Sequence, residues 1–173
     1  TDAYGFLENL RAGAPHWRPE AGAAVVLGAG GAARAVLHGL LGAGAPEIRL
    51  ANRTAARAEA LAEVFGPKVR ALAWEEREEA LAGAATIVNT TSLGMQGNPP
   101  LALRLDPAPR GALVTDIVYA PLETPLLAAA RARGMPVVDG LGMLLHQARP
   151  AFRAWFGRDP EVDEGLRAAC LAP

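Results

Sequence analysis

A run of five apolar residues, Ala23–Leu27, leads directly into the glycine-rich segment Gly28–Ala33. A short, uninterrupted apolar run predicts a strand that is buried on both faces, as in parallel sheets covered by helices on each side. Small and aliphatic residues then recur at helical spacing over Gly31–Leu41, and Gly42 ends that segment. The chain therefore contains a strand, a tight loop and a helix in immediate succession.

Strands and helices continue to alternate after this unit. We expect strands at residues 23–27, 48–51, 69–73, 85–89, 112–116 and 136–139, and helices at 31–41, 55–65, 74–81 and 124–133. Three more segments with helical patterns, 4–10, 141–156 and 160–171, lie outside this alternation. Buried strands that alternate with helices predict an α/β fold, here a doubly wound parallel sheet of about six strands with extra N-terminal and C-terminal helices.

The glycine-rich segment fits the pattern G-x-G-x-x-A in the position where it binds a dinucleotide. Gly28 permits a tight turn, Gly30 lets the backbone come close to a pyrophosphate, and Ala33 lets the helix pack closely on the strand. The N-terminus of the following helix offers free N–H groups and the positive end of its dipole to phosphates. This context favours a Rossmann-like dinucleotide site; the alternative is a glycine-rich turn that only allows tight helix packing.

The end of the second predicted strand bears on the choice of dinucleotide. NAD-binding domains place there an acidic side chain that binds the ribose 2′-hydroxyl, whereas this chain has Asn52, Arg53 and Thr54, with Arg57 one turn later. A guanidinium pairs with a 2′-phosphate, which a carboxylate would repel. We therefore expect NADP as the cofactor; the alternative is that both arginines are ordinary solvated surface charges.

Composition excludes several other classes of protein. The 173 residues, 51% of them hydrophobic and with a formal net charge of −1, suit one globular domain with short appendages rather than a disordered chain. No apolar run is long enough to cross a bilayer, and the charge offers no positive field for nucleic acid. The single Cys170 rules out an internal disulfide, and three scattered histidines form no metal-binding pattern. We expect a cytoplasmic protein.

Six motifs, in order along nearly the whole chain, resemble those of the shikimate dehydrogenase family. Thr1–Phe6 resembles the end of the family segment N-T-D-G-x-G-F, with Ala3 in place of the usual glycine. The glycine-rich loop and the turn at Asn52 are similar to the family's two cofactor-binding motifs. The other three matches are Asn89–Met95, Asp116–Tyr119 with Pro121, Thr124 and Pro125, and Asp139–Ala148.

The resemblance implies an NADP-linked interconversion of 3-dehydroshikimate and shikimate, in aromatic amino-acid biosynthesis. The matching positions for the pyrophosphate are Gly28, Ala29, Gly30, Gly31 and Ala32, and those for the adenosine phosphate end are Asn52, Arg53, Thr54 and Arg57. The positions along the ribose and nicotinamide are Thr91, Ser92, Ile117 and Gly140. The positions at the substrate are Asp2, Tyr119 and Gln147, with Asp2 as the acidic half of a catalytic Lys–Asp pair.

The resemblance omits one half of the family's active site. In the family a substrate-binding domain precedes this segment and carries the catalytic lysine, whereas the only lysine here, Lys68, matches no family site and is expected to be a surface charge. We therefore expect a piece of a longer protein, with a linker helix in residues 1–20, the NADP-binding domain in 21–140, and helices that would pack toward the missing domain in 141–173. We expect this chain alone to bind cofactor without turnover.

Other interpretations remain open. The chain is alternatively a stand-alone NADP-binding or regulatory module, or part of a quinate/shikimate dehydrogenase paralogue. The turn at Asn52 and the motifs around Tyr119 and Gln147 disfavour a related Rossmann domain, such as that of a methylene-tetrahydrofolate dehydrogenase or a glutamyl-tRNA reductase. A further hypothesis is that the chain forms a homodimer or repositions its last helix to cover apolar residues near its ends, namely Leu7, Leu10, Phe152, Trp155, Phe156 and Leu166.

Overall fold

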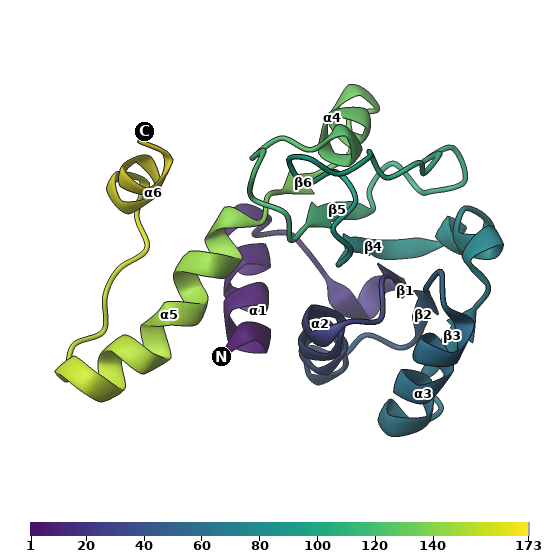
Figure 1. Cartoon of the computed structure of the whole chain (residues 1–173), viewed down its shortest axis with the longest axis horizontal. Helices are drawn as coiled ribbons and strands as arrows, with labels where there is room; N and C mark the ends of the chain where they lie inside the picture. Colours follow the sequence, from purple (N-terminus) through teal and green to yellow (C-terminus); the bar gives the residue numbers. More distant parts are fainter. Residues whose placement is uncertain (173) are drawn as a thin grey trace.

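The computed structural model describes residues 1–172 of the chain. Six parallel strands form one sheet in the order β3-β2-β1-β4-β5-β6, which confirms the predicted doubly wound fold (Figure 1). The elements in chain order are α1 (Asp2–Gly13), η1 (Pro19–Ala21), β1 (Ala23–Leu27), α2 (Gly31–Gly42), β2 (Ile48–Ala51), α3 (Ala55–Phe65), β3 (Val69–Leu72), η2 (Trp74–Arg77), η3 (Glu79–Leu81), β4 (Ala84–Asn89), β5 (Leu113–Asp116), α4 (Pro125–Ala132), β6 (Val137–Val138), α5 (Leu141–Phe156) and α6 (Glu164–Leu171).

The register of the strands brings their carboxyl ends to one edge of the sheet. Leu27 of β1 lies between Ala51 of β2 and Asn89 of β4, and Asn89 is in turn beside Asp116 of β5. The strand order reverses between β1 and β4, and open α/β sheets bind ligands in the crevice at such a switch point. We therefore expect the loops that follow these strand ends to form a ligand-binding site.

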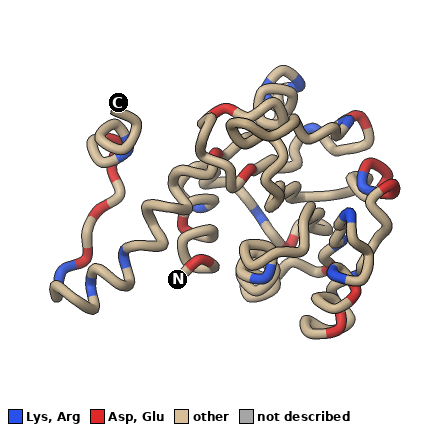
Figure 2. Tube along the Cα trace, viewed as in Figure 1, with Lys and Arg blue, Asp and Glu red and all other residues tan. Residues whose placement is uncertain are grey.

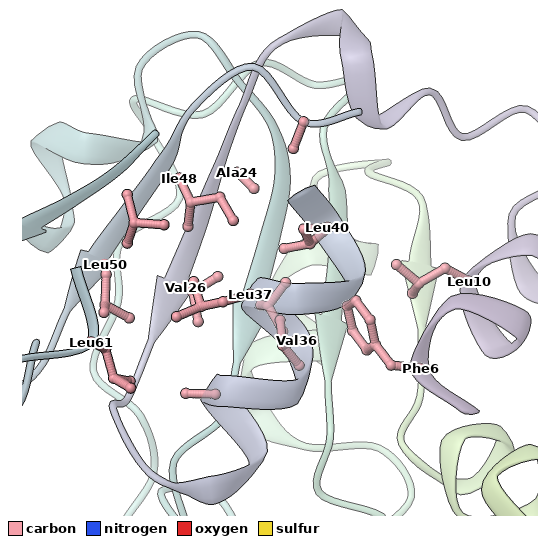
Figure 3. Packing of buried hydrophobic residues seen from close by; sticks show 14 of the residues in the cluster. Phe6, Leu10, Ala24, Val26, Val36, Leu37, Leu40, Ile48, Leu50 and Leu61 are labelled. Atoms are coloured by element: carbon pink, nitrogen blue, oxygen red, sulfur yellow. The ribbon is translucent and has the colours of Figure 1, made fainter. Parts of the chain in front are cut away.

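Two hydrophobic clusters, one on each face of the sheet, hold these elements together. Successive residues of β1 point to opposite faces, so Val26 belongs to one cluster and Leu27 to the other. Figure 3 shows the first cluster, in which Leu37 of α2 packs toward the sheet and Phe6 of α1 packs beside α2. The second cluster joins the sheet to α4, η3 and the segment 101–108.

The acidic segment 74–81, which was expected to be one helix, forms the two short 3-10 turns η2 and η3 instead. Two of its side chains bond to the segment 102–104. Glu78 pairs with Arg104 at 2.8 Å, and Arg77 donates to the Ala102 carbonyl. These contacts to a segment distant in sequence explain why the local prediction was wrong.

The terminal helices pack on the domain through α1, which lies against both α2 and α5. The prediction that Leu7 and Leu10 lack cover is wrong, because Leu10 is fully buried and Leu7 packs against the core. The second half of α5 and the whole of α6 extend away from the sheet, as Figure 1 shows. Among the helices of residues 1–172, none has both the length and the apolar character needed to cross a membrane.

Candidate functional site

The glycine-rich loop connects the carboxyl end of β1 to the start of α2. Gly28 has φ +105°, a conformation that favours glycine, and a Cβ atom there would lie 2.6 Å from Thr90 Oγ1. The N–H and O–H groups of Thr90 both donate to the Leu27 carbonyl, at 2.8 and 2.7 Å, so the residue after β4 fixes this turn. A Cβ atom at Gly30 or Gly31, in contrast, would meet nothing within 4 Å. The loop therefore leaves open space in front of the N–H groups that begin α2.

The turn that follows β2 is bonded to this loop through one side chain. Asn52 Oδ1 accepts a hydrogen bond from the Ala29 N–H at 3.2 Å, and Asn52 Nδ2 donates to the Thr54 carbonyl at 2.8 Å. Thr54 is the N-cap residue of α3. Asn52 thus sets the spacing between the glycine-rich loop and the start of α3, and both ends of its amide are engaged by the protein.

Three arginines surround the loop and the turn. Arg34 lies in the first turn of α2, Arg53 in the turn after β2 and Arg57 in the first turn of α3. All three are exposed, and over residues 1–172 none of them takes part in a salt bridge. Elsewhere along the chain acidic and basic residues are interspersed (Figure 2). Free guanidinium groups beside a helix N-terminus suit an anion with more than one phosphate.

Arg34 is not among the cofactor-binding positions expected from the sequence. Arg34 follows Gly30 by four residues and is the fourth residue of α2. This spacing could have identified it as a further cationic residue beside the glycine-rich loop. Arg34 also lines an open depression of about 480 Å³ together with Gly31, His38 and Asp2. The N-terminus of α1 is therefore next to the start of α2.

A buried polar network organises the loops after β4 and β5. Asn89 Nδ2 donates to Asp116 Oδ1 at 3.0 Å, and Asn89 Oδ1 accepts from the N–H and O–H groups of Thr91. Asp116 Oδ1 also accepts from the Val118 N–H, and Asp116 Oδ2 accepts from the Thr124 hydroxyl at 2.8 Å. Burial raises the pKa of the Asp116 carboxyl, and the hydrogen bonds from Val118, Asn89 and Thr124 oppose that rise. This network holds both loops in place at the carboxyl edge.

The residues predicted to lie along a ribose and nicotinamide come together on these loops. Thr91 and Ile117 are half-buried, and Ser92 is exposed. Gly140 is buried at the start of α5, and a Cβ atom there would clash with the Ile117 carbonyl oxygen. The loops after β4, β5 and β6 thus lie at the same edge of the sheet as the glycine-rich loop.

The three residues predicted to contact a substrate come from different elements. Asp2 is exposed at the first position of α1, and Gln147 is half-buried on α5. A Cβ atom built on Gly5, one turn after Asp2, would lie 2.6 Å from the Gln147 Cβ, so α1 and α5 are in close contact there. Tyr119 is 49% exposed in the loop after β5.

Lys68 lies at the other edge of the sheet, and the three histidines form no metal site within residues 1–172. Lys68 is exposed immediately before β3, and its carbonyl accepts from the Ile48 N–H at the start of β2, so it belongs to the amino edge of the sheet. His16 and His38 are exposed, and His146 is buried on α5. The described part of the chain holds no group of three or more side chains arranged to bind a metal ion.

Fold, strand order and glycine-rich loop define the class of this chain as a Rossmann-like α/β domain. Residues 18–95 match the family model described as shikimate / quinate 5-dehydrogenase, and residues 140–170 match the shikimate 5′-dehydrogenase C-terminal domain. The chain belongs to the shikimate dehydrogenase family.

Curated relatives extend the similarity over almost the whole chain. It is 64% identical over 172 residues to the shikimate dehydrogenase (NADP(+)) of Dinoroseobacter shibae and 63% identical over 175 residues to that of Rhodospirillum rubrum. Each alignment covers 99% of this chain and 62% of the relative. The chain therefore spans less than two thirds of the length of these relatives.

Solved structures agree with the fold. The quinate dehydrogenase from Corynebacterium glutamicum in complex with NAD has a TM-score of 0.90 and 35% identity, covering 99% of this chain and 61% of that one. The shikimate 5-dehydrogenase from Thermus thermophilus in complex with NADP(H) and shikimate has a TM-score of 0.77 and 43% identity, covering 92% of this chain and 57% of that one.

Proposed function

We propose that this chain is the NADP(H)-binding portion of a shikimate dehydrogenase, an oxidoreductase that interconverts 3-dehydroshikimate and shikimate. The observation that carries the proposal is the open glycine-rich loop beside Arg53 and Arg57, which have no ionic partner within residues 1–172. No acidic residue stands in the turn after β2, where NAD-binding domains place one. The relatives named above as NADP(+)-dependent support the same cofactor.

The chain's own residues divide the cofactor between them. The open backbone at Gly30 and Gly31 and the start of α2 would hold the pyrophosphate. Arg53 and Arg57 would pair with the 2′-phosphate, and Asn52 would keep their turn at the correct distance from the loop. The residues left for the ribose and nicotinamide end are Thr91, Ser92, Ile117 and Gly140.

A nicotinamide held by these residues would supply or accept the hydride. Asp2, Tyr119 and Gln147 would contact the substrate, with Asp2 assisting proton transfer to the carbonyl oxygen. In the Lys–Asp pair that the resemblance implies, a lysine acts together with Asp2. Lys68, the only lysine of this chain, lies at the opposite edge of the sheet, so the lysine of the pair would have to come from outside this chain. Positioned proton transfer is worth about 10²- to 10⁴-fold in rate, so we propose that residues 1–173 bind cofactor but do not turn over alone.

Calorimetric titration of the chain with NADPH and, separately, NADH tests the cofactor assignment. We expect NADPH to bind and NADH to bind at least about tenfold more weakly, since hydrogen bonds between charged groups contribute about 1.5–3 kcal/mol. Arg53→Gln should weaken NADPH binding about tenfold and leave NADH unchanged. The matched control is Arg70→Gln, which removes an exposed arginine of β3. Equal binding of both nucleotides to the wild-type chain would contradict the role of Arg53.

A second experiment concerns turnover. The purified chain, incubated with shikimate and NADP⁺, should show no absorbance change from NADPH formation above that of a Gly30→Ala variant. Sustained turnover by the wild-type chain would overturn the proposal that it lacks part of the active site.

Two related functions use the same edge of the sheet. A quinate/shikimate dehydrogenase paralogue that uses NAD is favoured by one observation, the TM-score of 0.90 to the quinate dehydrogenase described in complex with NAD. A stand-alone NADP-binding or regulatory module would bind NADPH and lack turnover in every context. A preference for NADH over NADPH in the titration would support the quinate/shikimate dehydrogenase paralogue.

We further propose the division into residues 1–20, 21–140 and 141–173, a cytoplasmic location and a homodimer. The basis for the homodimer is a surface on α5 formed by Phe152, Trp155 and Phe156, which are 40%, 78% and 63% exposed. Apolar side chains gathered in this way favour association.

A further inference from the structure

A cavity of about 470 Å³ lies at the amino edge of the sheet, opposite the glycine-rich loop. Its floor is formed by Ala85, Leu113 and Val137, which lie at the starts of β4, β5 and β6. One wall is the segment Gly13–Arg18, which connects α1 to η1. Concave, mostly apolar cavities of about 300–1,000 Å³ with a few placed polar groups are the usual form of small-molecule sites.

A fixed indole ring lines this cavity. Trp17 Nε1 donates to Thr86 Oγ1 at 2.9 Å, and Thr86 is a buried residue of β4. The backbone N–H of Trp17 donates to the Ala14 carbonyl, which holds the connecting segment in a turn. Trp17 is partly buried against the core, and because both its ring and its backbone are held, the part of its apolar surface that lines the cavity forms a wall at little entropic cost. Such a wall suits a flat aromatic partner.

The charge at the rim of the cavity has one sign. Arg18 is exposed, and its guanidinium donates only to the Trp17 carbonyl, at 3.2 Å, in the part of the chain that the structure describes. His16 is the other titratable side chain that lines the cavity, and no Asp or Glu of residues 1–172 lines it. Arg18 also borders the neighbouring depression, which is lined by Glu20. A guanidinium without an ionic partner at the mouth of an apolar cavity is suited to a carboxylate.

We infer that this cavity is a second ligand site, which binds a small aromatic carboxylate between the Trp17 ring and the starts of β4–β6, with its carboxylate on Arg18. The cavity offers an apolar interior and one cationic contact, whereas the dinucleotide site offers backbone N–H groups and several arginines. The two sites lie at opposite edges of the sheet and share no lining residue, so their ligands do not compete for the same contacts. The inference does not depend on the proposed function.

Nuclear magnetic resonance titration of the ¹⁵N-labelled chain tests this site with two probes, indole-3-acetate and its neutral isostere indole-3-acetamide. We expect indole-3-acetate to shift the Trp17 indole N–H and the amides of Gly111 and Val137 in a saturable manner. The acetamide should bind about tenfold more weakly, since it lacks the charge that Arg18 pairs with. Arg18→Gln, a change at an exposed residue, should bring the two affinities to within about twofold.

Arg11→Gln is the matched control, because Arg11 is an exposed arginine that lines a neighbouring depression and not this cavity. This variant should keep the tenfold preference for the acetate, and saturating NADPH should leave the affinity unchanged. Equal affinity of the two probes for the wild-type chain, shifts centred on Arg11 or on the glycine-rich loop, or no saturable shift at millimolar probe would each overturn the site. A chain that binds the probe but not NADPH would overturn only the proposed function.

Discussion

At the scale of single residues, Gly28 and Gly30 show how neighbouring positions in one loop meet different constraints. Gly28 needs its positive φ and has Thr90 against it, so the fold requires a glycine there. Gly30 has an extended backbone and open space around it, so the fold tolerates a side chain. Only a ligand that approaches the backbone would need Gly30.

Alanine at each position separates these two roles. Gly28→Ala should lower the free energy of unfolding by about 1–3 kcal/mol, because a non-glycine residue is strained at that φ. Gly30→Ala should change it by less than about 0.5 kcal/mol and should weaken NADPH binding about tenfold or more, a loss of about 1.4 kcal/mol. Denaturant unfolding and calorimetric titration measure the two effects. A Gly30→Ala variant that binds NADPH normally would contradict the placement of the pyrophosphate.

Asp116 is a second residue whose surroundings decide its chemistry. Burial raises its pKa, so the folded state binds a proton at this carboxyl more tightly than the unfolded state does. The contribution of Asp116 to the free energy of unfolding is therefore fully present at pH values below the ordinary aspartate pKa, near about 4. It declines as the pH rises from there through the raised pKa of the folded state.

The variant Asp116→Asn removes this titration. Its amide fits the network if the Thr124 hydroxyl reverses and accepts a hydrogen bond. We expect the wild-type chain to gain stability relative to Asp116→Asn as the pH is lowered from 7 toward 4, measured by denaturant unfolding at each pH. Asp116→Ala, which leaves Asn89 and Thr124 without their partner, should cost about 1–3 kcal/mol at pH 7. A pH-independent difference between wild type and Asp116→Asn would contradict the direction of the pKa shift.

At the scale of secondary structure, the contact between α1 and α5 depends on two glycines. A Cβ atom at Gly5 would lie 2.6 Å from the Met143 carbonyl oxygen and 2.7 Å from the Gln147 nitrogen, both backbone atoms of α5. A Cβ atom at Gly142 would clash with the Asn9 side chain, whose Nδ2 donates to the Asp139 carbonyl at 2.6 Å. These contacts place Gln147 next to α1 near Asp2.

Gly5→Ala should therefore lower the free energy of unfolding by about 1–3 kcal/mol, since the backbone of α5 has to move to admit the methyl group. Gly42→Ala is the control, because Gly42 ends α2 in open space, and alanine there should be neutral or stabilising by up to about 1 kcal/mol. Chemical denaturation of both variants measures the difference. Equal stability of Gly5→Ala and the wild-type chain would show that the helices are not held this closely.

At the scale of the whole molecule, the parallel sheet separates two edges with different chemistry. The carboxyl edge carries the glycine-rich loop, the three arginines and the Asn89–Asp116 network. The amino edge carries Lys68 and the cavity beside Trp17. The first half of α5 packs on α1, whereas its second half and α6 project from the domain as an arm; the Arg167–Asp139 pair, at 2.8 Å, connects α6 back to the residue before α5.

The proposed homodimer is a property of this arm. The rings of Phe152 and Phe156 are 4.7 Å apart, and Trp155 lies between them in sequence. Sedimentation velocity over a range of concentrations should show a monomer–dimer equilibrium for the wild-type chain. The double variant Trp155→Glu/Phe156→Glu should shift it to monomer, whereas Val64→Glu, at an exposed apolar residue of α3, should not. A wild-type chain that stays monomeric at high concentration would contradict the proposal.

Local patterns in the sequence were sufficient for the strand–loop–helix unit and the six-strand parallel sheet, whereas most of the expected site residues came from the family resemblance. Buried parallel strands have to be apolar throughout, and a loop that approaches a phosphate has to be rich in glycine, so both leave a mark on consecutive residues. The turn of Asn52–Thr54 could also be identified from consecutive residues, because an arginine stands where NAD-binding domains place an acidic residue.

Contacts between distant segments decided the rest. The acidic segment 74–81 became two turns because Glu78 and Arg77 bond to the segment 102–104. Leu10 was buried in the cluster that joins α1 to α2, α5 and the sheet, and Asp116 received donors from β4 and from the start of α4. The cavity beside Trp17 is lined by residues from four separate stretches of the chain. Such features depend on which surfaces meet after the sheet has formed, and no local pattern encodes that.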